Sequence, residues 1–111
     1  MVLRDSHITA NTASELGGGI YCEGVDSSIQ ILGNSSVSGN SALNGGGIAI
    51  ENSCSGRLNS GLVTFASNET IGIMANHATQ NGGGLYLSNA QNVLLDEAAI
   101  AECVFSEYII I

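Results

Sequence analysis

The chain has 111 residues, of which 44% are hydrophobic and only 11% are charged, and its formal net charge is −8. Arg4 and Arg57 are its only Lys or Arg residues. This argues against nucleic acid or an anionic membrane surface as a partner, because binding to either needs several basic side chains. No apolar run reaches the ~18 residues of a membrane-spanning helix, and the N-terminal residues lack the apolar region of a signal peptide. The length predicts one domain.

The first pattern runs from Ile8 to Cys22, where the sequence is I-T-A-N-T-A-S-E-L-G-G-G-I-Y-C. It consists of an apolar residue, Asn11, an alanine, a polar link, a glycine triplet and an apolar-x-apolar run. The alternation in that last run predicts a strand with one buried face. Residues 27–32, S-S-I-Q-I-L, alternate in the same way and predict another strand.

The same pattern returns at residues 37–50 and again at residues 73–87. Further strands are predicted at residues 61–65 and 92–95, and another copy begins at Ile100, with Cys103 in the Asn position. The equivalent Asn positions are 29, 36 and 27 residues apart, and we assign the longest spacing mainly to an insertion at residues 53–61. The predicted repeats are 8–36, 37–72, 73–99 and a partial repeat at 100–111, with about three short strands in each full repeat.

This organisation predicts an all-β fold, a right-handed parallel β-helix of about three to four coils, with strands of successive coils about 4.8 Å apart. The glycine triplets form one stacked corner, where backbones approach closely, and Gly24, Asn52 and Asn89 form a second corner. Equivalent asparagines stack into a structural ladder whose amides satisfy backbone groups of the turns. The members of this predicted ladder are Asn11, Asn40 and Asn76.

We treat residues 1–111 as a single β-helix segment and expect it to be a fragment of a longer one. No capping segment covers the predicted first coil, and V-F-S-E-Y-I-I-I at the C-terminus is apolar. Open solenoid ends invite further strand pairing. We therefore expect self-association through uncapped ends.

The repeats resemble those of the chlamydial polymorphic outer-membrane proteins, in which an F-x-x-N tetrad precedes a G-G-A-[I/L/V] tetrad. Here I-T-A-N at residues 8–11 precedes G-G-G-I at residues 17–20, and the later copies keep this order, with Ile or Val replacing Phe and Gly replacing Ala. The resemblance extends over about residues 8–105. It implies a surface protein similar to the secreted passengers of autotransporter adhesins, located at the cell surface or outside the cell.

A search for chemistry predicts no catalytic residue, no metal site and no cofactor. Glu23 and Glu51 occupy equivalent outward positions, which fits either a calcium site or the acid pair of a polysaccharide-cleaving enzyme. Because the third equivalent position is Ser88, we favour two solvated acids. His7 and His77 do not share a column, so they do not predict a metal site.

The cysteines give little indication of their role from spacing alone. The chain has three of them without a C-x-x-C pair, which predicts neither a disulfide framework nor a zinc site. Cys22 shares a predicted inward column with Ile50 and Leu87, so we interpret it as a small buried hydrophobic residue. The sequence leaves the redox state of the cysteines open.

Three residues are candidates for contact with a partner. Tyr21 and Tyr86 share an outward column with Ala49, where they would stack on a sugar, anchor a protein or shield the strand backbone. Arg57 lies in the predicted insertion at residues 53–61, and loops on one face of a solenoid often carry binding.

The regular repeats and sparse charges favour a non-catalytic structural or adhesive module of a cell-surface or secreted protein, with a host or cell-surface protein or glycan as partner. The alternative is a fragment of a carbohydrate-active enzyme similar to pectate lyases or polygalacturonases. The fold alone does not decide between them.

Overall fold

The computed structural model describes residues 1–60, 72–90, 93–95 and 100–101. Within these residues all regular secondary structure is β-strand, and every strand pairing is parallel. This part of the chain contains no helix long and apolar enough to cross a membrane. The all-β class with parallel strands is therefore as the sequence predicts.

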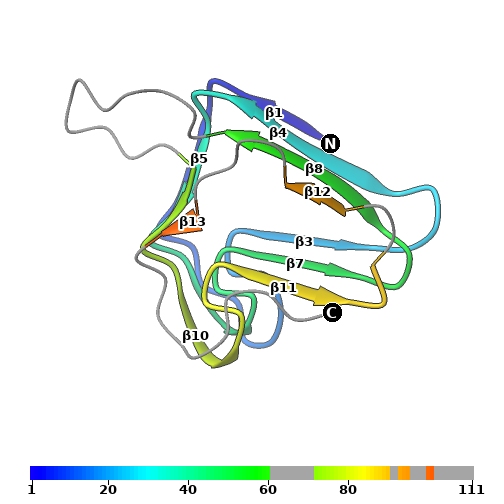
Figure 1. Cartoon of the computed structure of the whole chain (residues 1–111). Coiled ribbons are helices and arrows are strands. Elements are labelled where there is room, and N and C mark those ends of the chain that lie inside the picture. The colour runs from blue at the N-terminus through cyan, green and yellow to red at the C-terminus, as the bar shows by residue number, and fades with distance from the viewer. Residues whose placement is uncertain (61–71, 91–92, 96–99, 102–111) are drawn as a thin grey trace.

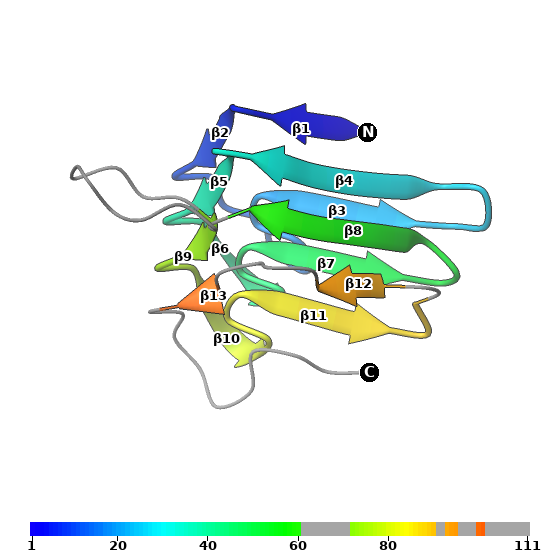
Figure 2. The ribbon, with the colours of Figure 1, turned by 45° about the horizontal axis from the view of Figure 1, so that its top comes forward.

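The described strands form four sheets, shown in Figures 1 and 2. The first has the order β1-β4-β8-β12, with β1 at Val2–Arg4, β4 at Ser28–Gly33, β8 at Ser55–Ser60 and β12 at Val93–Leu95. The second has the order β13-β9-β5-β2, with β2 at His7–Thr9, β5 at Ser36–Ser38, β9 at Gly72–Met74 and β13 at Ile100–Ala101. The third pairs β6, Ser41–Asn44, with β10, His77–Asn81. The fourth has the order β11-β7-β3, with β3 at Ile20–Glu23, β7 at Ile48–Glu51 and β11 at Leu85–Ser88.

The chain visits these sheets in the same order in each repeat. It runs through β4, β5, β6 and β7, and then through β8, β9, β10 and β11, so each strand lies beside its counterpart from the previous repeat. At the positions equivalent to β6 and β10, the first repeat has only two isolated β-bridges, Thr12↔Ser41 and Leu16↔Asn44. The expectation of about three strands per repeat is wrong, because the polar link after each asparagine also pairs with its neighbour and adds a fourth.

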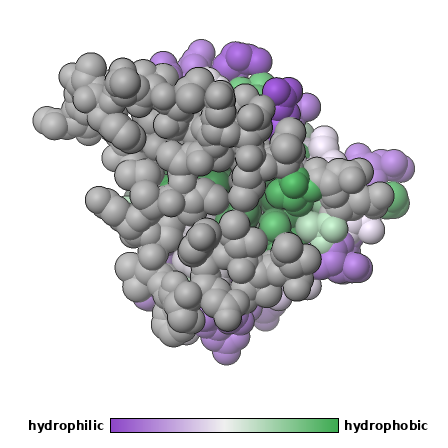
Figure 3. Space-filling view, viewed as in Figure 1, coloured by the Kyte–Doolittle hydropathy of each residue, from purple (hydrophilic) through white to green (hydrophobic). Residues whose placement is uncertain are grey.

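The core lies between the sheets and is built from stacked apolar columns. Ile20, Ile48 and Leu85 are in register with one another, as predicted, and the last two are fully buried. Ile31 and Val37 extend the core from the first and second sheets. In the view of Figure 3, hydrophilic residues lie mainly around the rim, whereas hydrophobic residues show toward the middle. Burial of these columns is the main source of stability.

Residues with positive φ mark both predicted corners. The first glycine of each triplet has φ between 63° and 67°, and the residues of the second corner have φ of 102°, 48° and 55°. These residues are Gly17, Gly45 and Gly82 at the first corner, and Gly24, Asn52 and Asn89 at the second. Glycine and asparagine adopt this region most readily, which explains why they recur at these places.

The register corrects the position of the insertion. Residues 55–60, which the sequence led us to treat as inserted, form β8 and pair with β4 from Ser28↔Ser55 to Gly33↔Ser60. The next paired residues are Ser36 and Gly72. The extra residues therefore lie between Ser60 and Gly72, and the strand predicted at residues 61–65 lies outside the described residues. The error arose because S-G-R-L-N-S lacks the apolar alternation by which strands are identified.

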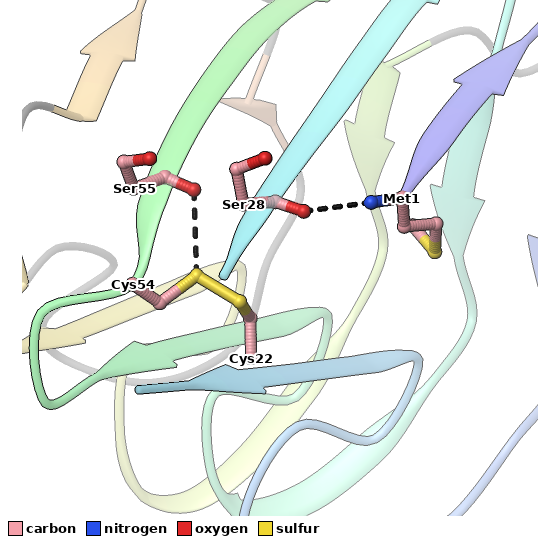
Figure 4. The surroundings of a disulfide bond; sticks show 5 residues. All are labelled: Met1, Cys22, Ser28, Cys54 and Ser55. Atoms are coloured by element: carbon pink, nitrogen blue, oxygen red, sulfur yellow. Dashed lines mark hydrogen bonds between the residues drawn. A yellow bond between two sulfur atoms is a disulfide. The ribbon is translucent and has the colours of Figure 1, made fainter. Parts of the chain in front are cut away.

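Cys22 and Cys54 form a disulfide, with their Cα atoms 6.0 Å apart. Both are buried members of the core, and Cys54 Sγ lies 3.3 Å from the carbonyl oxygen of Ser55 (Figure 4). The interpretation of Cys22 as a simple hydrophobic residue is therefore wrong. The spacing of the cysteines in the sequence does not indicate this pairing, because the pairing depends on which residues of adjacent repeats lie in register. Cys22 lies opposite Ile50, just before the corner that leads to Cys54.

We expect the disulfide to stabilise the fold by about 2–4 kcal/mol, because it closes a long loop of the unfolded chain. Urea unfolding of the oxidised chain should therefore have a higher midpoint than unfolding in the presence of a thiol reductant. The double variant Cys22→Ala/Cys54→Ala is the control, since its midpoint should not respond to the reductant. Equal midpoints for the oxidised and reduced chain would contradict the expectation.

Candidate functional site

The asparagines at equivalent positions form one column of side chains between the repeats. Oδ1 of Asn40 accepts from the backbone N–H of Asn11 at 2.8 Å and from its Nδ2 at 3.1 Å. Oδ1 of Asn76 accepts the same two bonds from Asn40, at 2.9 and 3.1 Å. Nδ2 of Asn40 also donates to the carbonyl of Ile8, and Nδ2 of Asn76 to that of Val37. Each buried amide thus joins its own repeat to the one before it.

Burial makes these bonds important for the stability of the stack. Asn40 and Asn76 are 1% and 0% exposed, whereas Asn11 is exposed. No buried side-chain N or O atom among the described residues is without a hydrogen-bond partner. Removing one member from the middle of the column would leave buried donors or acceptors unpaired.

A second asparagine pair was not predicted from the sequence. Oδ1 of Asn44 accepts from the backbone N–H and from Nδ2 of Asn81, each at 3.1 Å. Both residues directly precede a glycine triplet, but the first repeat has Leu16 at this position, so the pattern occurs only twice. Two occurrences are too few to distinguish these asparagines from the other polar residues of the link.

The glycine corner lies next to the asparagine column and has a fixed polarity. The N–H groups of residues 45–48 donate to the carbonyl oxygens of residues 81–84 at 2.9 to 3.1 Å. The N–H groups of residues 17–20 donate in the same direction, toward the second repeat. A Cβ atom at Gly47 would lie 2.6 Å from the carbonyl oxygen of Gly84, so only glycine allows the repeats to approach this closely here.

The outward face of the fourth sheet carries the two predicted contact tyrosines. Tyr21 is 42% exposed and Tyr86 is partly buried, while Ala49 between them in register is fully buried. The Tyr21 hydroxyl donates to Glu51 Oε2 at 3.2 Å, so its ring extends from β3 toward the next repeat. A shallow groove of about 320 Å³ lies beside Tyr21 and the loop at residues 13–16. This face combines an aromatic ring with carboxylates.

Glu23 and Glu51 are paired with neutral polar groups. Glu23 Oε2 accepts from Asn52 Nδ2 at 3.1 Å, and this bond, followed by one from Tyr21, lowers the pKa of Glu23. Partial burial, together with the hydrogen bonds and negative charges of Glu23 and Glu51, raises the pKa of Tyr21 to about 12. The described residues include no group of three or more His, Cys, Asp or Glu side chains that could hold a metal ion.

Arg57 lies on a different part of the molecule from the tyrosines. It is exposed on β8, where it is in register with Gln30 and Leu94, and it is not at the tip of an inserted loop. The first sheet, to which β8 belongs, lies across the interior from the fourth sheet (Figure 1). The structure therefore does not bring Arg57 together with Tyr21 and Tyr86.

The two histidines also lie apart, on β2 and β10. His7 Nδ1 and Ser36 Oγ are hydrogen-bonded at 2.6 Å across β2 and β5. His77 lines a groove of about 260 Å³ whose other lining residues are neutral. A catalytic histidine base is commonly oriented by a hydrogen bond to a carboxylate. In the described part of the chain neither histidine makes such a bond.

We expect Asn40→Ala to lower the free energy of unfolding by about 1–3 kcal/mol, because it leaves buried partners unpaired. Asn40→Asp should lower it further near neutral pH, because a carboxylate would face the oxygens of Ile8 and Asn76 in place of an amide donor. Asn11→Ala is the matched control and should cost less, since Asn11 is exposed. Thermal and urea unfolding measure all three; unchanged midpoints for both Asn40 variants would show that the column is not structural.

Tyr21 should ionise about two pH units above a free tyrosine, near pH 12. Its pKa is raised by folding, so the stability it contributes is present below pH 10 and lost as the pH rises through the folded pKa of about 12. Ultraviolet titration of phenolate should show Glu51→Gln lowering this pKa, because the substitution removes a nearby negative charge. Tyr21→Phe identifies the transition, and an unshifted pKa in Glu51→Gln would contradict the pairing.

One comparison with known proteins identifies a repeat type in the chain. Residues 5–23 match the model of the Chlamydia polymorphic membrane protein repeat. The match covers β2, Asn11, the first glycine triplet and β3, which are the elements on which the resemblance in the sequence rests. No curated protein and no solved structure matches the chain. The match confirms the resemblance for the first repeat.

Proposed function

We propose that the chain is a right-handed parallel β-helix that serves as a non-catalytic structural and adhesive module of a cell-surface or secreted protein. The single segment 1–111 would contain the repeats 8–36, 37–72, 73–99 and 100–111. The constant order in which the chain visits its sheets supports a coil that closes on itself once per repeat. The right hand follows from the strong preference of parallel crossover connections.

The observation that carries the functional proposal is the match of residues 5–23 to a polymorphic membrane protein repeat. The residues of that repeat are engaged in stacking: Asn11 bonds to the next asparagine, and the N–H groups of residues 17–20 bond to the next glycine corner. A segment whose characteristic residues hold repeats together is suited to presenting a long surface. Binding would then depend on the residues that face outward.

The buried disulfide independently supports a location outside the cytoplasm. Structural disulfides persist in oxidising compartments and are rare where thioredoxin and glutathione keep thiols reduced. Cys22 and Cys54 are 8% and 0% exposed, so this bond belongs to the core and is shielded from soluble thiols. A secreted or surface-exposed chain meets the conditions under which such a bond forms.

For the partner contact we propose two separate areas, the fourth sheet with Tyr21 and Tyr86, and Arg57 on the first sheet. The partner would be a host or cell-surface protein or glycan. The enzymatic alternative has no comparable support, because the two candidate carboxylates, Glu23 and Glu51, are bonded to Asn52 and Tyr21.

Binding of the labelled chain to cultured epithelial cells tests this proposal. We expect saturable binding that is weakened several-fold by Tyr21→Ala, since an aromatic anchor is among the residues that contribute most to interfaces. Val25→Ala, in an exposed turn, is the control and should bind like the original chain. Pretreating the cells with protease or with glycosidase separates a protein partner from a glycan.

The absence of saturable binding would overturn the adhesive proposal. The enzymatic alternative is tested separately by incubating the chain with polygalacturonate, with and without calcium. New unsaturated or reducing ends would show that the chain is an enzyme, and an unchanged polymer is the result that we expect.

A further inference from the structure

A groove of about 260 Å³ lies on the outward side of the third sheet, and the function proposed above does not use it. Its lining extends across three repeats, from Thr12 in the first, through Leu43 in the second, to Thr79 in the third. The groove opens to the side of the stack. A further layer at either end of the stack would therefore add beyond the first or third repeat and leave the groove open.

The groove exists because the link between the asparagine and the glycine triplet differs in length between repeats. The link has five residues in the first and third repeats, 12–16 and 77–81, but only four in the second, 41–44. In the register of β6 and β10, Thr79 and Gln80 together lie opposite Leu43 alone. The first repeat also has one extra residue at this place. The chain therefore bulges on both sides of Leu43, which lies in the notch between the bulges.

The walls of the groove carry polar side chains that the fold does not use. Ser14, His77 and Thr79 are exposed, and within the described parts of the chain none of these side chains has a hydrogen-bond partner. Thr12 Oγ1 and Ser41 Oγ are hydrogen-bonded to each other at 3.2 Å, and each hydroxyl oxygen has capacity for a further bond. The walls therefore offer several donors and acceptors around an apolar floor.

The charge of the groove restricts the ligand. Its lining residues include no Asp, Glu, Lys or Arg. An anion would have no Lys or Arg to pair with and would be repelled by the net charge of −8, and a metal cation would have no carboxylate ligand. A neutral ligand with several hydroxyl groups and one apolar face fits these walls and this floor, and a sugar ring has both features.

The size of the groove sets the length of the ligand. Sites for drug-sized ligands have volumes of about 300–1,000 Å³. A groove of about 260 Å³ is smaller than these, so it has room for one ring and not for a chain of several.

We propose that this groove binds a single ring of a neutral saccharide, such as the terminal unit of a glycan. The apolar face of the ring would lie on Leu43, and its hydroxyl groups would bond to Ser14, His77 and Thr79. The inference goes beyond the proposed function, whose contacts lie on the first and fourth sheets. It depends only on the register of the third sheet and of the first repeat beside it.

Saturation-transfer difference NMR with the full chain tests the proposal. The probes are the methyl glycosides of glucose, galactose, mannose and N-acetylglucosamine, titrated separately. At least one of them should bind saturably with a dissociation constant of about 1 mM, because one sugar ring buries little surface. N-acetylneuraminic acid, an anionic sugar, should bind more weakly than this neutral ligand.

Variants of the chain locate the site. The double variant Ser14→Ala/Thr79→Ala should weaken binding of the neutral glycoside about tenfold, because it removes two hydrogen-bonding hydroxyls. Gln80→Ala is the matched control, since Gln80 is exposed on β10 but does not line the groove, and it should bind like the original chain.

A length variant tests the origin of the groove. Inserting one glutamine between Leu43 and Asn44 gives the second link the length of its neighbours, which should fill the notch and abolish binding. Far-ultraviolet dichroism and thermal unfolding establish which variants are folded. The double variant changes only exposed side chains, so it keeps the test decisive if the insertion disturbs the fold.

No saturable binding of any of the four glycosides, or undiminished binding by the folded double variant, would overturn the proposed saccharide site. Tighter binding of N-acetylneuraminic acid than of every neutral glycoside would overturn its assignment to a neutral sugar. These results would leave the adhesive proposal standing, because that proposal is tested by cell binding through Tyr21. The two failures are therefore distinguishable.

Discussion

Stacked parallel repeats keep their order only if each residue stays over its counterpart, because a shift by one residue turns every side chain of a strand to the opposite face. The asparagine column fixes this register at one place in each of the first three repeats. Asn40 contacts the repeat before it through Ile8 and Asn11, and the repeat after it through Asn76. Since these bonds are buried, a shifted register would leave polar groups without water or partners, and such a state is strongly disfavoured.

What the sequence could predict is what recurs at fixed offsets in every repeat. Asn11, Asn40 and Asn76 lie at the same distance from an apolar residue, and the structure places them in one column. The glycine corners and the stacking of Ile20 on Ile48 follow from the same offsets. The residue type at each of these positions is restricted by the equivalent residue of the neighbouring repeat. The same residue type therefore recurs along the sequence, where it can be recognised.

Features that depend on one particular contact between repeats were not predictable. The disulfide joins Cys22 to a cysteine beyond the next corner, at a separation of 32 residues that matches no motif. Strand β8, Ser55–Ser60, is polar, and it is a strand because it lies beside β4, not because of its own composition. For the same reason the polar links that form β6 and β10 could be recognised only from the register.

The division between buried and exposed positions shows which residues of the fourth sheet are held by the stack. In the fourth sheet the inward residues Ile48 and Leu85 are fully buried and constrained by their columns. The alternate positions of these strands hold Tyr21, which is exposed, Ala49, which is fully buried, and Tyr86, which is partly buried. Substitution of the exposed Tyr21 would change the surface of this sheet, while the asparagine column and the glycine corner would continue to set the register. The residues that set the register are therefore separate from the exposed residues of the same sheet.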